Sequence, residues 1–106
     1  MAMEIRVIER DDVSAIEKLG GAKIDINLIN LQIIIENEPK PLSFDDVLRG
    51  VREAGALVGR LANGDISIST FRRILVIPKG YGIADSVTGQ INRMAISEAL
   101  GRLAGF

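Results

Sequence analysis

The chain has 106 residues and a net charge of −1, from 13 basic and 14 acidic side chains, and it contains neither cysteine nor histidine. This length fits one domain, and the nearly balanced charge argues against a protein built mainly to bind nucleic acid, although a local basic patch is compatible with it. The missing residue types exclude disulfides, thiol nucleophiles, cysteine or histidine metal sites and histidine acid–base catalysis.

The first expected element is a short strand over residues 3–9, where apolar and charged residues alternate weakly. Asp11 and Asp12 can then cap a helix whose apolar positions fall within residues 13–19. The glycine pair at 20–21 is expected to end this helix.

Residues 22–36, AKIDINLINLQIIIE, are predicted to form a strand. Their apolar residues change phase, from Ile24, Ile26 and Leu28 to Leu31, Ile33 and Ile35. A period of two cannot shift by one residue without a bulge, a turn or burial on both faces, so a break is expected at Asn30. The two prolines in residues 37–41 predict a loop.

The clearest helix is predicted over residues 44–61, with Ser43 as the N-cap and Asp46 completing a short-armed capping box. Its apolar residues recur at spacings of three and four, and Asn63-Gly64 is expected to end it. Three glycines lie inside it, each at a cost of about 0.8–1 kcal/mol relative to alanine. They are Gly50, Gly55 and Gly59. Either they allow a close backbone approach to the sheet or a partner, or tertiary packing holds the helix despite them.

Two strands are predicted next, Ile66–Thr70 and Ile74–Ile77, turning around Phe71, Arg72 and Arg73. The run ILVI is typical of a central strand that is buried on both faces, and Pro78 ends it. Residues 79–82 form a connector, and a last helix is predicted from Asp85 or Ser86 to about residue 104.

These elements predict one α/β domain over residues 1–106, with residues 84–106 as an appended C-terminal helix. The expected architecture is a small mixed sheet of four to five strands with two to three packed helices. Its order is strand, helix, strand, helix, strand, strand, and then the C-terminal helix.

Candidate sites are few. Lys79 and Gly80, ahead of a helix, could bind an anion through backbone N–H groups, and the alternative is a plain loop. Arg72 and Arg73, with Phe71, could contact a phosphate or a base, and the alternative is a solvated hairpin tip.

The acidic pairs at 11–12 and 45–46 are explained as helix N-terminal residues, so no metal site is expected. No catalytic residue and no cofactor is expected either, because no nucleophile–base pair can be named. A ribbon-helix-helix arrangement, with helices at 83–91 and 94–104 after the strand ILVIP, is a further alternative.

Two stretches resemble the SepF family of cell-division proteins. They are RVIERDDVSAIEKLGGAKIDINLINL and GVREAGALVGRLANGDISISTFRRILVIPKGYGI, and the match covers about residues 5–83. The resemblance implies a non-enzymatic protein that dimerises, polymerises and binds the tubulin-like polymer FtsZ.

The resemblance also implies a turn at Asn27-Leu28 or Asn30-Leu31 and a helix-to-strand turn over residues 63–66. The family's glycine in the second helix falls on Leu57, between Gly55 and Gly59. The family's amphipathic membrane helix has no counterpart, so membrane tethering is not expected.

We therefore expect a self-associating α/β scaffold, with the protein itself as the first partner and a division polymer as a further one. The interface is expected at Gly55, Leu57 and Gly59 on the second helix, and at Leu31, Ile33 and Ile35, an apolar run that a sheet edge must cover.

The alternatives are a nucleic-acid-binding module that uses Arg72, Arg73, Lys79 and Arg93, and a small anion- or nucleotide-binding domain with its site at residues 79–86. The chain has no apolar run of membrane-spanning length and no signal-peptide pattern, so a cytoplasmic location is expected.

Overall fold

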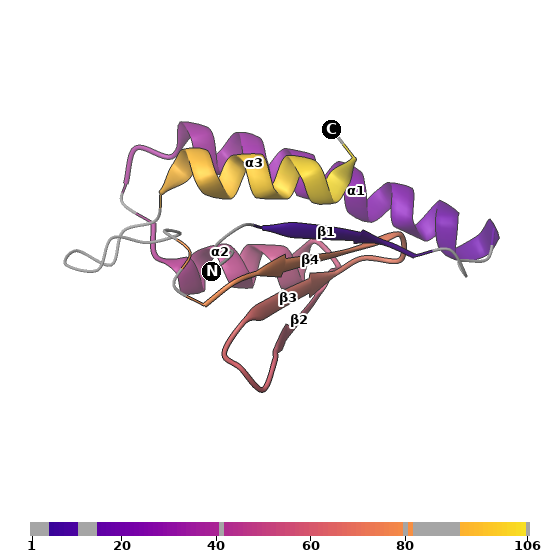
Figure 1. Cartoon of the computed structure of the whole chain (residues 1–106). Helices are drawn as coiled ribbons and strands as arrows, with labels where there is room; N and C mark the ends of the chain where they lie inside the picture. The colour runs from indigo at the N-terminus through magenta and orange to yellow at the C-terminus, as the bar shows by residue number, and fades with distance from the viewer. Residues whose placement is uncertain (1–4, 11–14, 41, 80, 82–91, 106) are drawn as a thin grey trace.

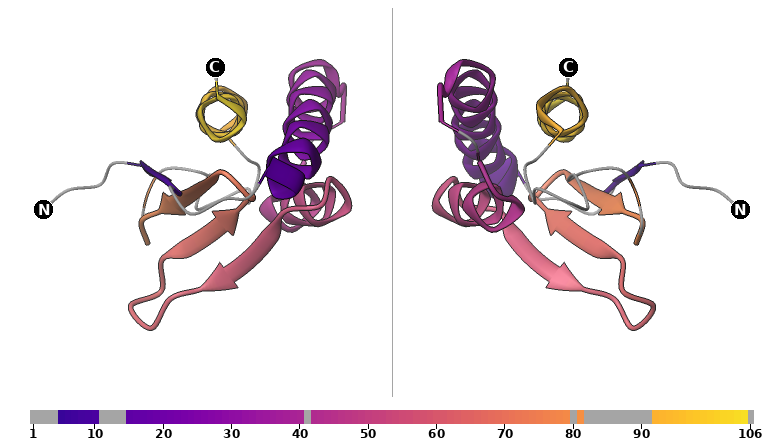
Figure 2. Two further views of the ribbon diagram at one scale, coloured as in Figure 1. Left: turned by 90° about the vertical axis from the view of Figure 1, so that its right-hand side faces the viewer. Right: turned by 90° about the vertical axis from the view of Figure 1, so that its left-hand side faces the viewer.

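The computed structural model describes residues 5–10, 15–40, 42–79, 81 and 92–105, with the backbone alone for residues 15–21. Its elements are β1 (Arg6–Glu9), α1 (Ala15–Asn37), α2 (Phe44–Glu53), β2 (Leu57–Arg60), β3 (Ile66–Ser69), β4 (Arg73–Ile77) and α3 (Arg93–Ala104). α3 lies over one face of the sheet and beside α1, and α1 lies above α2, which is next to β2 (Figures 1 and 2). The expected class, a small α/β domain, is confirmed.

The four strands form one sheet in the order β1-β4-β3-β2, and every pairing is antiparallel. β2, β3 and β4 follow one another as a meander, and β1 pairs with the other edge of β4. The run ILVI is therefore a central strand, as predicted. The sheet is antiparallel and not mixed, because the strand expected at residues 22–36 is a helix and takes no part in it.

α1 is the main departure from the prediction, because one helix runs through the expected stop at Gly20-Gly21 and through the expected strand. Ile29 is half-buried against the core, and the row of positions that packs into it is Ile24, Leu28, Leu31 and Ile35. Their spacings of four, three and four follow a helical period, so the apparent phase change near Asn30 is the signature of a helix and not of a bulge. The expected turns at Asn27-Leu28 and Asn30-Leu31 therefore lie inside α1.

α2 begins as predicted and ends much earlier. Its N-cap Ser43 forms the full capping box with Asp46. At the other end, Gly55 takes a φ of +105°. Its N–H donates to the carbonyl of Arg52, and the N–H of Ala56 donates to the carbonyl of Val51. This is the Schellman arrangement, which ends a helix at a glycine.

Gly59 consequently lies in β2, and Asn63-Gly64 turns from β2 into β3 instead of ending a helix. Of the three glycines that were expected inside the helix, only Gly50 is there. A Cβ on Gly50 would lie 2.8 Å from Leu31 Cδ1, so this glycine does allow a close approach, between α2 and α1.

The β3–β4 hairpin is confirmed, with Ile68 opposite Leu75. The described part of the last helix begins at Arg93 behind the N-cap Asn92 and ends at Gly105, and the residues expected to start it, Asp85 and Ser86, lie outside the described residues. Its Leu100 and Leu103 are buried in the core that α1, α2 and the sheet share.

Candidate functional site

The outer face of α1 carries most of the exposed large apolar side chains of the described helices. Ile26, Ile33 and Ile34 leave 58%, 52% and 57% of their surface in water. Asn30 and Asn37 are exposed on the same side, at spacings of four and three from the isoleucines. We call these five residues the outer stripe of α1.

The stripe exists because α1 has apolar residues around most of its circumference. Its inner side is used by the fold: Leu28 and Ile35 are buried in the core, and Leu31 packs against Gly50 of α2. A helix with one apolar side buried and another apolar side in water has more apolar surface than its own fold covers.

Two polar residues of α1, Gln32 and Glu36, face α3. Gln32 donates from Nε2 to the Ser97 hydroxyl at 3.0 Å, and that hydroxyl donates to the carboxylate of Glu36. A depression of about 450 Å³ lies over these residues, with Arg93, Met94 and Glu98 on its walls. Ser97 is buried and has both of its hydrogen-bonding partners within the protein, so this network joins the two helices.

The expected interface residues are spread over several places in the structure. Ile35 is buried and Leu31 is half-buried, whereas Ile33 belongs to the outer stripe. Leu57 is 74% exposed on β2, an edge strand of the sheet. The two expected glycines have local partners: Gly55 lies against Ile24 at the end of α2, and Gly59 lies against the Ser67 hydroxyl of β3.

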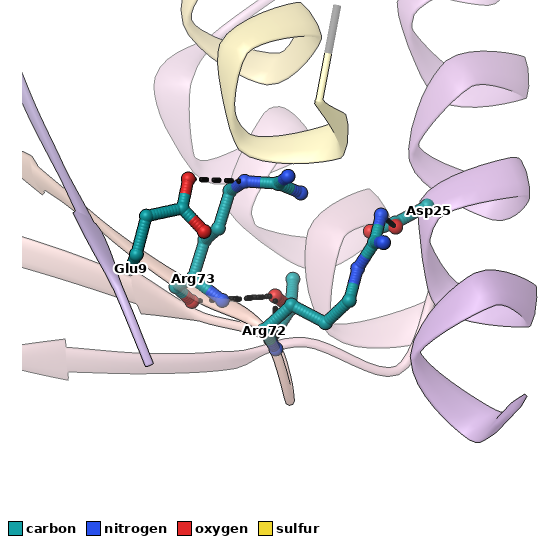
Figure 3. Close-up of polar contacts among 5 residues, drawn as sticks. Glu9, Asp25, Arg72 and Arg73 are labelled. Atoms are coloured by element: carbon teal, nitrogen blue, oxygen red, sulfur yellow. Dashed lines mark hydrogen bonds and ion pairs between the residues drawn. The ribbon is translucent and has the colours of Figure 1, made fainter. Parts of the chain in front are cut away.

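Arg72 and Arg73, the expected phosphate contacts, are bound within the fold. The Arg72 guanidinium forms an ion pair with the buried carboxylate of Asp25 in α1 (Figure 3). Arg73 donates from Nε to Glu9 Oε1 at 2.9 Å. Its guanidinium also lies against Gly105 at the C-terminal end of α3, where the helix dipole favours a positive charge.

Thr70 organises the connection between these strands, and no sequence motif identified it. Its hydroxyl accepts from the N–H groups of Arg72 and Arg73 at 3.2 and 3.0 Å, and it is buried. Arg10 adds two bonds to this connection, from its N–H to the Arg72 carbonyl and from Nη1 to the Thr70 carbonyl. The tip is therefore an ordered structural junction and not a freely solvated loop.

The other expected basic contacts also have roles in the fold. Arg93 donates to the carbonyls of Ile35, Glu38 and Lys40, where α1 ends. The Ile35 carbonyl lies in the last turn of α1, where carbonyls have no partner within the helix, and the other two carbonyls follow the helix. Lys79 donates from its backbone N–H to Asp65 at 2.8 Å, and Gly80 lies outside the described residues.

Three arginines that no sequence motif singled out as a site lie around one pocket between α2 and β2. Arg49, Arg52 and Arg60 line a pocket of about 370 Å³, together with Asp45. The signal that could have identified two of them is their spacing on α2, since residues three and four apart share a helix side. Arg60 reaches the pocket from β2, which was predicted to be part of the same helix.

Comparison of the chain with protein-family models, with curated proteins and with solved structures found no match. Among the described residues, no cluster of acidic side chains has the arrangement of a metal site. None of the helices in the described segments combines the length and the apolar character needed to cross a membrane.

Proposed function

We propose that the protein is a non-enzymatic scaffold that self-associates, with two copies meeting along the outer stripe of α1. The observation that carries this proposal is the exposure of Ile26, Ile33 and Ile34, each more than half in water on one helix. Adjacent exposed apolar side chains of this size are typical of interaction surfaces.

The dimensions and energies of α1 are compatible with a reversible dimer. Its 23 residues span about 34 Å, long enough to form a helix pair. Burying the exposed halves of six isoleucines, three from each copy, contributes roughly 5–10 kcal/mol. Association itself costs about 4–15 kcal/mol, so the dimer needs further contacts beside the stripe and is expected to be concentration dependent.

A second copy is the occupant that the stripe fits, because the stripe is complementary to itself in the antiparallel direction. With a two-fold axis at Asn30, Ile26 of one helix lies against Ile33 and Ile34 of the other. The two Asn30 amides meet at the axis, where each can donate to and accept from the other. In this register Lys23, three residues before Ile26, lies opposite Asn37 and near Glu36 of the partner helix, which brings opposite charges near each other twice.

The experiment is sedimentation equilibrium of the full chain over a range of concentrations, with two matched variants. Ile26→Lys/Ile33→Lys places charges in the proposed interface. Leu57→Lys changes an even more exposed apolar residue on β2, away from α1. We expect a wild-type dimer, a monomeric double variant and an unchanged Leu57→Lys variant, with circular dichroism confirming that all three are folded.

A wild-type protein that stays monomeric at high micromolar concentration would overturn the proposal. A dimer that Leu57→Lys dissociates and the double variant does not would also overturn it, and would assign self-association to the sheet. If the monomer instead binds lipid vesicles through the isoleucines, the stripe is a membrane-surface contact and the proposal is wrong.

A further inference from the structure

The pocket between α2 and β2 brings together cationic side chains from two elements. Its residues are Asp45, Leu48, Arg49, Arg52, Val58, Gly59, Arg60 and Ile66, and its volume is about 370 Å³. We call it the arginine pocket. It lies away from the outer stripe of α1, so ligand binding in this pocket does not depend on self-association.

The two elements place these arginines by their own periodicities. Asp45, Arg49 and Arg52 are spaced by four and three residues, so they lie on one side of α2. On β2, successive side chains point to opposite faces, so Arg60 shares the face of Val58. Val58 packs against the core, so its face of β2 is the one next to α2. Arg60 is therefore on the α2 side of the strand, where it lines the pocket.

Part of the pocket's lining is apolar. Leu48 is buried in the core, and Val58 and Ile66 are half-buried and packed against it. The lining therefore combines three guanidinium groups with a smaller apolar part, a combination that suits a ligand with one strongly charged part and one small apolar part.

The charge of the pocket is not balanced from within. Three guanidinium groups face one carboxylate, that of Asp45, so the lining carries a net positive charge. Within the described residues, Arg49 forms one ion pair, to Asp46 at 3.5 Å, and no ion pair is found for Arg52 or Arg60. Like charges held close together repel one another, and a bound anion relieves that repulsion.

The chain as a whole does not attract anions, because its net charge is −1. A positive pocket on such a protein is a local feature. Guanidinium groups present paired N–H donors that match two oxygens of a phosphate at once, which an ammonium group cannot do.

From this arrangement we infer that the arginine pocket binds a small organic phosphate. The phosphate group lies among Arg49, Arg52 and Arg60, and the apolar part of the ligand lies on Leu48, Val58 and Ile66. The pocket recognises the phosphate by charge and by paired hydrogen bonds, and it recognises the organic part by burial of apolar surface.

The test uses phenyl phosphate and inorganic phosphate as probes, because they present the same phosphate group with and without an apolar ring. Titrations of the full chain are followed in ¹H–¹⁵N NMR spectra. We expect shifts at residues of the pocket and tighter binding of phenyl phosphate. The variant Arg52→Gln/Arg60→Gln is expected to weaken binding by about tenfold or more.

The matched control is Arg6→Gln, which removes an exposed charge from β1, at the opposite edge of the sheet. We expect it to leave the affinity unchanged within about twofold. An equal loss in Arg6→Gln would show attraction by overall charge and would overturn the inference. So would the absence of shifts in the pocket at millimolar probe.

A short oligothymidylate serves as a third probe, because it shows whether the pocket prefers a nucleic-acid backbone to a small ligand. If it binds more than about tenfold more tightly than phenyl phosphate and the double variant abolishes this, the site reads a nucleic acid and the inference fails. Weaker or equal binding of the oligonucleotide supports the small organic phosphate.

Discussion

The guanidinium of Arg72, in the β3–β4 connection, is ion-paired with the carboxylate of Asp25 in α1, a side chain that is only 7% exposed. This pair joins the tip of the central hairpin to the long helix across 47 residues of sequence (Figure 3). The pair gives the buried carboxylate a counter-charge, and it ties α1 to the end of the hairpin.

Removing Arg72 should lower the free energy of unfolding more than removing the charge of Asp25. Arg72→Met leaves the Asp25 carboxylate buried without its cation, and we expect a loss of about 3 kcal/mol in the free energy of unfolding, at the low end for a buried pair because Arg72 is partly exposed. Asp25→Asn should cost less, since the Arg72 guanidinium can still reach water. Urea denaturation measures both, and equal losses would contradict the assigned roles.

The two glycines at Gly55 and Gly101 should respond to alanine in opposite directions. Gly55→Ala places a side chain at a φ of +105° and 3.1 Å from Ile24, so we expect a loss of about 1–2 kcal/mol. At Gly101, inside α3, a Cβ meets its nearest atom at 3.4 Å, in Gln32. Alanine there should stabilise by up to about 0.8–1 kcal/mol through helix propensity. Thermal unfolding should show a lower Tm for Gly55→Ala and a higher Tm for Gly101→Ala. A stabilising Gly55→Ala would contradict the assignment of Gly55 as the residue that ends α2.

Arg93→Gln should weaken the junction between α1 and α3. The guanidinium donates to three carbonyls beyond and within the last turn of α1, and losing these bonds should cost about 1.5–3 kcal/mol. Hydrogen exchange should rise most at the C-terminal end of α1. Arg6→Gln on β1 is the control with the same change of charge, and an equal loss of stability there would argue against a specific cap.

The capping box at the start of α2 predicts a pH dependence. The N–H of Ser43 donates to the Asp46 carboxylate, and this backbone bond, followed by the side-chain bond to Ser43 and the charge of Arg49, lowers the pKa of Asp46 below its ordinary value of 3.8. Because the folded-state pKa is the lower one, the contribution of Asp46 to stability is complete above pH 3.8 and is lost as the pH falls through the folded-state value. NMR titration should show the lowered pKa, and Ser43→Ala, which removes the side-chain bond and keeps the backbone bond, should raise it only part of the way toward 3.8; a wild-type pKa at or above 3.8 would reject the assignment.

The antiparallel helix pair predicts a charge-dependent dimer. Lys23→Glu places two acidic side chains near each other at each end of the pair, so we expect the dimer to weaken. Adding Glu36→Gln removes the repulsion and keeps an acceptor for Ser97, and it should restore part of the affinity. Sedimentation at low and high salt measures the effect, which salt should reduce. A Lys23→Glu variant that dimerises like the wild type would exclude this register.

Much of the fold could be predicted from local patterns, and the largest failure has one physical cause. The β3–β4 hairpin, the capping box at Ser43 and the buried run ILVI were all predicted, because each is specified by residues close together in sequence. α1 was not, because its isoleucines favour strands and occupy so many positions that both a period of two and a helical period can be found in them. Assigning α2 through to residue 61 hid β2, and with it the arginine pocket.

The sequence by itself determined the α/β class, the hairpin, the central strand and the absence of cysteine and histidine chemistry, since these follow from composition and short-range pattern. Only the tertiary structure decided that residues 22–36 are helical, because the packing of Leu28 and Ile35 into a shared core outweighs the local preference of isoleucine for a strand. It also decided which isoleucines stay in water and which arginines are bound within the fold, because both depend on partners distant in sequence.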